Sequence, residues 1–329
     1  MEAKKIIFDT DIGWDCDDAG ALALIHSLCN KGEAELLAVT GTTYNKYIAG
    51  CIDAINRFYG RTAPVGVNYS RHSSFIDEEH PADVYAGYAK PICLEFPNSY
   101  KEGGAEDSVR VMRRTLANEA DNSVTIVATG TLSCLAQLVK SEADDISELS
   151  GAELIVKKVE RTVVMGGRFK DTWPMPILER GVGGVIVGEL NAEYNIKGDI
   201  KGAQTVCDNW PGELVFASYE LGNYCITLKN IQYDEKAPNP VAYAYKLFGF
   251  GDGRESWDLT AALYGIRPDY GYYHLHEFGK VNVSDDGTTT WGKSDKFRHS
   301  YLLPRQDYSF VENDIEAIIE SELPGKDKL

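Results

Sequence analysis

No apolar run in this sequence approaches the roughly eighteen residues that a membrane-spanning helix needs, so we expect a protein that does not cross a membrane. The start of the sequence also lacks the apolar segment of a secretory signal peptide. The seven cysteines are widely scattered and form no C-x-x-C pair, which favours reduced thiols over a disulfide framework. These absences predict a cytoplasmic protein, although a signal peptide that has been removed would leave the same sequence.

Positive charge is scarce as well. The 33 lysines and arginines are outnumbered by 50 aspartates and glutamates, which gives a net charge of −17. Nucleic acids and anionic membranes attract proteins through a basic surface, so neither is expected as a partner. The same balance disfavours a highly phosphorylated substrate, unless a local basic patch overrides the average.

Strand-like and helix-like segments alternate through the first two thirds of the chain. The expected strands are residues 6–8, 35–40, 64–67, 124–128 and 161–165. The expected helices are residues 19–28, 47–59, 108–118 and 132–139. Alternation of this kind is typical of βαβ units, so we predict an α/β fold with an open, mostly parallel sheet flanked by helices.

The remaining segments differ from this pattern. Residues 68–105 carry three prolines and are expected to form a long loop that could act as an active-site flap. Near the C-terminus we expect a small helical and hairpin region, with helices at 241–248, 259–265 and 315–322 and a hairpin within 272–291. The sequence shows no internal repeat, low-complexity tract or convincing linker. We therefore predict a single domain over residues 1–329, long enough to bury a large core.

Five aspartates are crowded into residues 9–18, directly behind the first expected strand. They are Asp9, Asp11, Asp15, Asp17 and Asp18. The cluster lies between the carboxyl end of a strand and the next helix, which is where open α/β sheets bind ligands. Crowded carboxylates repel one another unless a cation lies among them. Oxygen ligands favour a hard ion, Ca²⁺ or Mg²⁺.

Two simpler interpretations of the cluster are less satisfactory. Aspartates in the first turn of a helix often act as caps or complement the helix dipole, which would explain Asp17 or Asp18 but not Asp9 and Asp11. An EF-hand requires a glutamate at the twelfth position of its loop, and counting from Asp9 or Asp11 reaches Gly20 or Leu22 instead. We therefore predict a metal-binding or catalytic role. His26, on the apolar face of the following helix, is expected in the core.

Four segments of the sequence resemble motifs of the inosine–uridine nucleoside hydrolases. Residues 9–19, Asp-Thr-Asp-Ile-Gly-Trp-Asp-Cys-Asp-Asp-Ala, resemble the amino-terminal signature of that family. Residues 124–132 resemble its second strand-and-turn motif, and residues 163–167 and 191–195 resemble its Met-Gly-Gly and Ala-Glu-Phe-Asn segments. Trp257-Asp258 falls where the family usually has His-Asp. The order and spacing match from about residue 4 to residue 265.

The resemblance implies a Ca²⁺-dependent enzyme that hydrolyses the N-glycosidic bond of ribonucleosides to ribose and free base. It implies these metal ligands: Asp11, Asp18, the carbonyl of Thr129, and Asp258. It assigns the general base to Asp17 and sugar contacts to Glu193 and Asn195, with Asn45 and Asn191 as looser candidates. Glu193 and Asn195 are expected to project from one side of an extended segment. Members of the family are usually dimers or tetramers.

The residue types suit this chemistry. Cleavage of a riboside passes through an oxocarbenium-like transition state, which nearby carboxylates stabilise. A bound Ca²⁺ would lower the pKa of its water, and an adjacent aspartate would remove the proton. Chelation of the vicinal hydroxyls would select ribose over 2-deoxyribose.

The sequence departs from the family pattern in two places. The first loop has two more residues and one more aspartate than the commonest pattern, so the base and the ligands among Asp15, Asp17 and Asp18 stay open. Trp257 replaces the histidine that protonates the leaving base in many members. The protein would then use another acid, rely on stacking of Trp257 against the base, or turn over weakly. A core tryptophan beside a functional aspartate is an equal alternative.

Two other functions remain open from the residues. A protein that binds nucleosides or ribose without turnover would keep the aspartates and lose the histidine. A haloacid-dehalogenase-like phosphohydrolase also has Asp-x-Asp after a strand, but it needs a later acidic pair at a strand end, and Asp144-Asp145 lies in a polar segment instead. The preferred base is not predicted by any motif.

Overall fold

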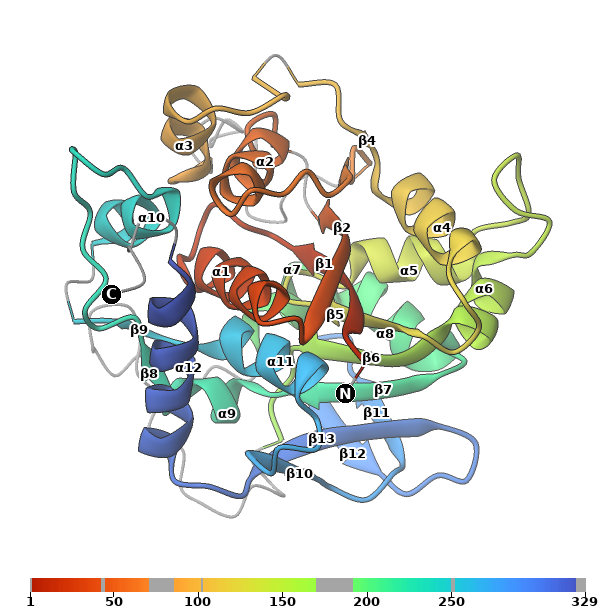
Figure 1. Ribbon diagram of the computed structural model, residues 1–329. Helices are drawn as coiled ribbons and strands as arrows, with labels where there is room; N and C mark the ends of the chain where they lie inside the picture. The colour runs from red at the N-terminus through yellow and green to blue at the C-terminus, as the bar shows by residue number, and fades with distance from the viewer. Residues whose placement is uncertain are drawn as a thin grey trace.

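The computed structural model describes residues 2–42, 45–70, 86–101, 103–169, 192–249 and 252–323. Its main sheet has nine strands among these residues, in the order β10-β13-β7-β6-β5-β1-β2-β3-β4 (Figure 1). The strands are β1 (Lys4–Thr10), β2 (Ala34–Gly41), β3 (Val65–Val67), β4 (Glu106–Asp107), β5 (Val124–Ala128), β6 (Val159–Met165), β7 (Glu213–Ala217), β10 (Tyr273–Leu275) and β13 (Arg298–Pro304). Neighbours pair in parallel except β10 and β13, so the predicted mixed, mostly parallel sheet is confirmed.

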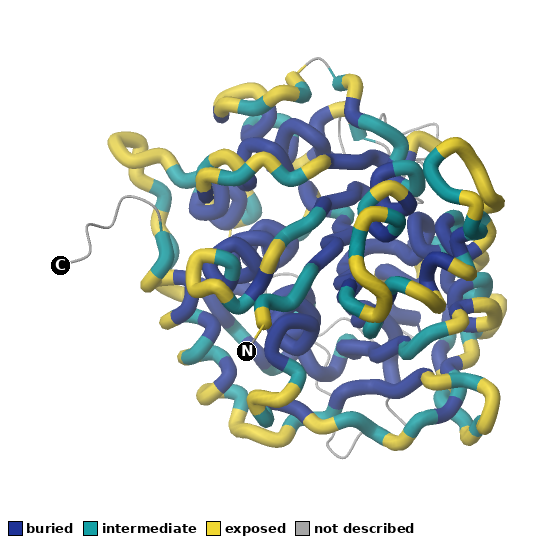
Figure 2. The backbone as a smooth tube through the Cα atoms, turned by 45° about the vertical axis from the view of Figure 1, so that its right-hand side comes forward, coloured by how far each residue is buried: buried dark blue, intermediate teal, exposed yellow. Residues whose placement is uncertain are grey.

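The central strands are apolar on both faces because helices cover both sides of the sheet. In β1, Ile6 and Phe8 belong to one hydrophobic core and Ile7 belongs to the other. In β6, Val163 and Val164 divide in the same way. Figure 2 shows that the backbone through the middle of the molecule is largely buried and that exposed residues lie mostly in the outer segments. Parallel sheets buried on both faces require such continuous apolar runs.

Two groups of helices form these layers (Figure 1). The first core is built with α1 (Asp17–Asn30), α2 (Ile48–Phe58), α3 (Ala89–Glu95), α10 (Pro240–Phe248), α11 (Trp257–Ile266) and α12 (Tyr308–Glu322). The second core is built with α4 (Ser108–Asn118), α5 (Ser133–Lys140), α6 (Gly151–Lys158) and α8 (Ile200–Asn209). The shorter elements are α7 (Tyr194–Gly198), α9 (Tyr219–Asn223), β8 (Ile226–Thr227), β9 (Arg254–Glu255), β11 (Lys280–Val283) and β12 (Thr289–Gly292). No helix in the described ranges is both long and apolar enough to cross a membrane.

The direction of strand addition reverses beside β1. Strands β2, β3 and β4 follow one another on one side of β1, whereas β5, β6 and β7 follow one another on its other side. The helices that follow β1 and β5 therefore pack in different cores, and the loops that lead to them meet at the carboxyl edge of the sheet, where ligands bind in open α/β folds. The aspartate cluster follows β1 and lies at this switch point.

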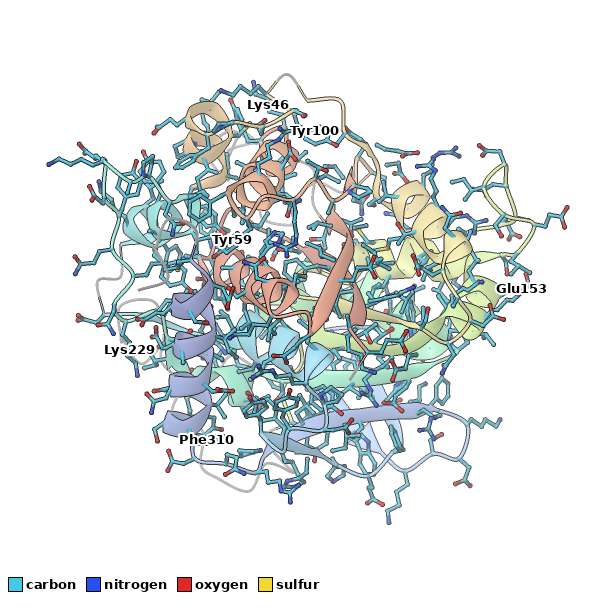
Figure 3. The ribbon with its side chains drawn as sticks, viewed as in Figure 1. Lys46, Tyr59, Tyr100, Glu153, Lys229 and Phe310 are labelled. Carbon is cyan, nitrogen blue, oxygen red and sulfur yellow. The ribbon has the colours of Figure 1, made fainter. Side chains whose placement is uncertain are left out.

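Several expectations of secondary structure were wrong. The segment expected as a loop, 68–105, contains α3 among its described residues; Pro91 lies in the first turn of that helix, where proline is tolerated. The sequence analysis missed α6, although Glu153, which is labelled in Figure 3, forms a capping box with Ser150 at its start. It also missed α8 and β7, and it began the last helix at 315 instead of Tyr308. The C-terminal hairpin is present as β11 and β12, whereas β10 joins the main sheet.

The expectations for the cysteines and for His26 were correct. All seven cysteines are free thiols, and six of them are buried. His26 is fully buried in α1, where its Nε2 is 2.8 Å from Oδ1 of Asn56 and its ring stacks on Tyr59. His26 is therefore a core residue.

Candidate active site

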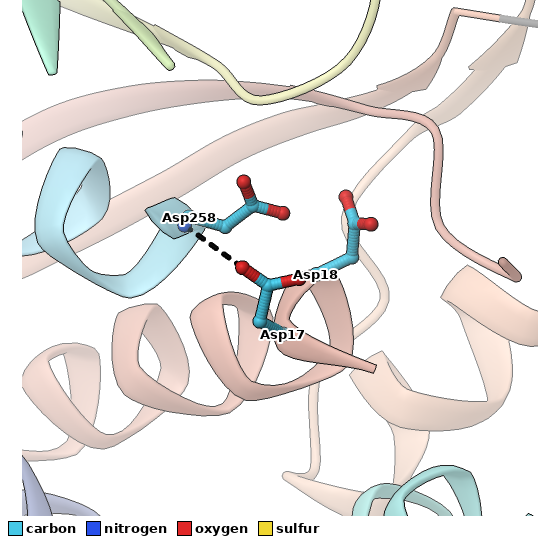
Figure 4. A group of neighbouring side chains, drawn as sticks. All are labelled: Asp17, Asp18 and Asp258. Carbon is cyan, nitrogen blue, oxygen red and sulfur yellow. Dashed lines mark hydrogen bonds between the residues drawn. The ribbon is translucent and has the colours of Figure 1, made fainter. Parts of the chain in front are cut away.

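Three buried carboxylates meet where the first turns of α1 and α11 approach each other. Asp17 and Asp18 come from α1, and Asp258 comes from α11 (Figure 4). Each offers one oxygen, and these oxygens all lie within 4.8 Å of one another. The backbone N–H of Asp258 also donates to Oδ2 of Asp17 over 3.1 Å. Both helix N-termini thus face the cluster, and their dipoles favour negative charge there.

The electrostatics of this cluster call for a cation. Burial raises the pKa of Asp17, Asp18 and Asp258 well above the ordinary value, and repulsion among the carboxylates raises each further. Burial likewise raises the pKa of Asp11 to about 7, and the charge of Asp11 in turn raises the pKa of Asp18 and Asp258. Buried carboxylates without a counter-ion must take up protons or bind a cation. The all-oxygen donor set fits a hard divalent ion.

Thr129 connects the end of β5 to this cluster. Its hydroxyl donates to Oδ1 of Asp18 over 3.3 Å, and its N–H donates to the carbonyl of Asp9 over 2.7 Å. The next residue, Gly130, has no room for a side chain, because an added Cβ would lie 2.8 Å from the backbone nitrogen of Asp11. The loops after β1 and β5 are therefore in close contact, and this contact brings the predicted ligands Asp11, Asp18 and Thr129 together.

The five aspartates of the first loop have different surroundings. The Asp9 side chain is fully buried and its Oδ1 accepts from the hydroxyl of Thr40 on β2 over 2.5 Å. The carboxylate of Asp15 forms two hydrogen bonds with Arg254 on β9, at 3.0 Å from Nε and 2.5 Å from Nη2. Asp9 is thus part of the sheet interior and Asp15 is part of an ion pair. The structure directs Asp17, unlike Asp15, towards Asp18 and Asp258.

Glu193 and Asn195 lie at the start of α7, so the expectation of an extended segment was wrong. The carboxylate of Glu193 caps α7 by accepting from the N–H groups of Asn195 and Ile196, and it also accepts from that of Gly167. The side-chain amide of Asn195 donates to the carbonyl of Thr129 over 2.8 Å. Both side chains are buried, and burial raises the pKa of Glu193 to about 7. They join the ends of β5 and β6 beside the aspartate cluster.

Of the two looser sugar-binding candidates, only Asn45 lies among the described residues. Oδ1 of Asn45 accepts from the N–H of Tyr47 over 2.9 Å, a local turn that precedes α2. Asn191 lies outside the described residues.

Trp257 is packed into the wall of the site. Its indole N–H donates to the carbonyl of Tyr219 over 2.9 Å, and its ring stacks on the Tyr219 ring at 5.6 Å. Gly222 permits this contact, since a Cβ there would lie 2.3 Å from the Cα of Trp257. The guanidinium carbon of Arg254 lies 4.8 Å from the centroid of the indole ring. Sequence reasoning missed Arg254, Tyr219 and Thr40, because single residues in short or distant elements carry no motif.

The model of the family described as inosine-uridine preferring nucleoside hydrolase matches residues 6–312. The inosine-uridine preferring nucleoside hydrolase from Bacillus anthracis is a structural neighbour, with a TM-score of 0.68, 19% identity, and coverage of 97% of this chain and 99% of that one. The purine-preferring ribonucleoside hydrolase from Gardnerella vaginalis has a TM-score of 0.66 at 16% identity, covering 97% of this chain and 99% of that one.

A third neighbour is the type III effector protein XopQ, whose structure is complexed with adenosine diphosphate ribose. It has a TM-score of 0.67 at 13% identity and covers 98% of this chain and 94% of that one. Structural similarity at such low sequence identity establishes the fold alone. Among curated proteins, no sequence gives a significant match.

Proposed function

The chain belongs to the inosine-uridine preferring nucleoside hydrolase family, and from this premise we propose that it hydrolyses ribonucleosides with a Ca²⁺ ion held by its aspartate cluster. Membership makes the chain an N-glycosidase by class. The observation that carries the proposal is the group of three buried carboxylates, Asp17, Asp18 and Asp258, at the switch point of the sheet. Their mutual repulsion favours binding of a divalent cation.

The residues that would hold the ion are Asp11, Asp18, Asp258 and the carbonyl oxygen of Thr129. All are oxygen donors, which suits Ca²⁺. The side-chain amide of Asn195 donates to the same Thr129 carbonyl and thereby orients it. When bound, Ca²⁺ would acidify a coordinated water and bind the 2′- and 3′-hydroxyls of the ribose.

Asp17 is the proposed general base. Its Oδ2 accepts the N–H of Asp258, which orients the carboxylate and leaves Oδ1 for the proton of the attacking water. As the water oxygen bonds to C1′, the bond from C1′ to the base nitrogen breaks and its electron pair leaves with the base. Asp15 is less suited to this role because both of its carboxylate oxygens accept from Arg254.

We propose ribose contacts for Glu193, Asn195, Asn45 and Asn191. Glu193 and Asn195 are the stronger candidates, since both are buried beside Thr129 and Gly167. Carboxylates near the ring stabilise the positive charge that develops during cleavage.

The clearest difference from the family pattern is at Trp257, where many members have the histidine that protonates the departing nucleobase. The indole of Trp257 has no proton to give near neutral pH, and its N–H is donated to the Tyr219 carbonyl. We infer that bases that leave readily without protonation are cleaved fastest. A cationic N-riboside, whose base leaves as a neutral molecule, is the extreme case.

A protein that binds a riboside without turnover is the second candidate. It is favoured by Trp257 in place of an acid and by the likeness to XopQ, whose structure holds adenosine diphosphate ribose. The haloacid-dehalogenase-like alternative has no such support.

One experiment separates these functions. Release of free ribose would be measured from a panel of ribonucleosides, their 2′-deoxy analogues and nicotinamide riboside, with Ca²⁺, after chelation, and after Ca²⁺ is restored. The hydrolase requires chelator-sensitive turnover of ribosides that is lost in Asp258→Asn and kept in Asp286→Asn, an exposed control in the hairpin turn. Ca²⁺-dependent binding of ribose without turnover would support the binding protein. Turnover that is indifferent to chelation would refute the metal-dependent mechanism.

A further inference from the structure

Both departures from the family pattern meet at one side chain, Arg254. Asp15 lies in the first loop, which has one more aspartate than the family pattern, and accepts two hydrogen bonds from Nε and Nη2 of Arg254. Trp257, at the family's histidine position, lies with its ring 4.8 Å from the guanidinium carbon. Asp15 and Arg254 are separated by 239 residues in the sequence. A single guanidinium group therefore touches both unusual residues.

The guanidinium of Arg254 is enclosed by protein groups. Only 6% of the side chain is exposed. The third nitrogen, Nη1, donates to Oε2 of Glu255 over 2.7 Å, and the ring of Phe248 lies 5.1 Å from the guanidinium carbon. All three nitrogens thus donate to carboxylates of this chain, and the group is held in one orientation. A planar, bidentate and stacked arginine of this kind fixes the positions of its partners.

The partners of Arg254 adjoin the proposed metal ligands on both sides. Asp15 lies just before Asp17 and Asp18, and its Oδ1 also accepts the N–H of Cys16, the residue that precedes α1. Trp257 is the residue directly before Asp258. Arg254 therefore connects the start of α1 to the start of α11, the two helix ends that present the carboxylates. The hydrogen bond from the N–H of Asp258 to Asp17 also joins the starts of these two helices, within the carboxylate cluster.

We propose that Arg254 is a positioning residue, which through Asp15 and Trp257 holds the proposed ligands Asp18 and Asp258, with Asp17 beside them, at the spacing that Ca²⁺ requires. The inference depends on the proposed function only for the identity of the ion. All three guanidinium nitrogens of Arg254 donate to carboxylates of this chain, so its proposed effect on the ion is indirect.

Whether loss of the Arg254 side chain weakens or strengthens Ca²⁺ binding distinguishes a positioning role from a purely electrostatic one. Removal of a buried positive charge beside the cluster would, by electrostatics alone, strengthen the binding of a cation. A merely structural role would lower the melting temperature and leave the Ca²⁺ affinity of the folded protein unchanged. A positioning role weakens Ca²⁺ binding, because the two halves of the site lose their fixed separation.

The test is the Ca²⁺ dissociation constant of Arg254→Met and Arg254→Lys, measured by isothermal titration on the folded full-length chain. Lysine keeps the charge but cannot bond both oxygens of Asp15 and stack on Trp257. The matched control is Arg267→Met at the other end of α11. Arg267 is similarly buried, makes two 2.7 Å bonds to Glu33 and lies 4.6 Å from the ring of Tyr270.

We expect both Arg254 variants to bind Ca²⁺ about 10–100-fold more weakly than the wild type. Arg267→Met should keep the wild-type affinity despite a lower melting temperature. Asp15→Asn should also weaken binding, and the double variant Asp15→Asn/Arg254→Lys should be little worse than either single variant. If Arg254→Met does not fold, Arg254→Lys and Asp15→Asn decide the question.

Unchanged or tighter Ca²⁺ binding in the folded Arg254 variants would overturn the inference and leave the proposed function intact. A wild-type chain that does not bind Ca²⁺ would overturn both.

Discussion

The backbone N–H of Asp258 donates a hydrogen bond to the carboxylate of Asp17, although the two residues are 241 positions apart in the sequence. This bond joins the first turns of α1 and α11 (Figure 4). It leaves one oxygen of Asp17 available within the cluster, which is the arrangement that a general base requires.

Asp17→Asn is expected to lower kcat by about 10²–10⁴-fold, because the amide cannot take the proton of the attacking water. Its remaining oxygen can still accept the N–H of Asp258, so the fold should be kept. Loss of the Asp17 charge weakens the attraction for Ca²⁺, but excess Ca²⁺ should not restore turnover, because the missing proton acceptor is still absent. Asp15→Asn is the comparison: excess Ca²⁺ should restore its turnover, since its defect lies in metal binding. Steady-state kinetics over a range of Ca²⁺ concentrations distinguishes the two. Equal rescue of both variants would contradict the assignment of Asp17 as base.

Gly130→Ala should weaken Ca²⁺ binding by about tenfold or more. A Cβ at this position would lie 2.6 Å from Oγ1 of Thr42 and 2.8 Å from the backbone nitrogen of Asp11, so the loops after β1 and β5 would have to separate. Gly292→Ala is the matched control, because its Cβ would meet nothing within 4 Å. Calcium titration of both variants checks the prediction, and equal affinities would show that the loop contact does not set the geometry of the ion site.

Glu193→Gln should lower the free energy of unfolding by about 1 kcal/mol, through a weaker cap on α7. It should also raise KM for the nucleoside, since the proposed ribose contact is weakened. Ser150→Ala provides the control, because it removes the cap of α6 at a similar cost and has no proposed contact with substrate. Urea denaturation and steady-state kinetics give the two quantities. A stability loss without a change in KM would reduce Glu193 to a structural cap.

His26 predicts a loss of stability in acid. Burial lowers its pKa to about 3, whereas an unfolded histidine titrates near 6.5. Below pH ~6.5 the unfolded chain therefore binds a proton that the folded chain does not. This single group should lower the free energy of unfolding by about 1.4 kcal/mol per pH unit down to pH ~3, and have no effect above pH ~7.

His26→Gln should remove that part of the pH dependence. Urea denaturation of both proteins between pH 7 and pH 4.5 gives the difference in free energy, in which contributions from shared carboxylates cancel. The wild type should have the larger free energy of unfolding at pH 7, and this difference should shrink as the pH falls. A difference that stays constant across this range would rule out a neutral buried imidazole.

Much of the fold could be predicted because local pattern and tertiary environment agree. The apolar run before Asp9 and the helical spacing after Asp18 predicted β1 and α1, and both are present. The prediction failed where a local signal pointed the other way: Pro91 suggested a loop, yet it occupies the first turn of α3. The short α9, at Tyr219–Asn223, has too few residues to show a period and was missed.

The sequence predicted which residues belong to the candidate site, but not which contacts they make. Asp11, Asp17, Asp18, Thr129 and Asp258 are recognisable by motif, and the structure gathers them at one edge of the sheet. Motifs did not separate the aspartates from one another. Only their surroundings distinguish them: Thr40 binds Asp9, Arg254 binds Asp15, and Asp17 faces Asp258.

By itself, the sequence determined the α/β class, the family and the oxygen-rich chemistry of the first loop, because strand, helix and motif signals are carried by neighbouring residues. Tertiary structure alone decided that Arg254 holds Asp15, that the Trp257 N–H is donated to Tyr219, and that Asn195 orients the Thr129 carbonyl. These contacts join segments dozens to hundreds of residues apart. Their geometry depends on how β1, β5 and the helices pack, and packing is a property of the whole chain that no local pattern encodes.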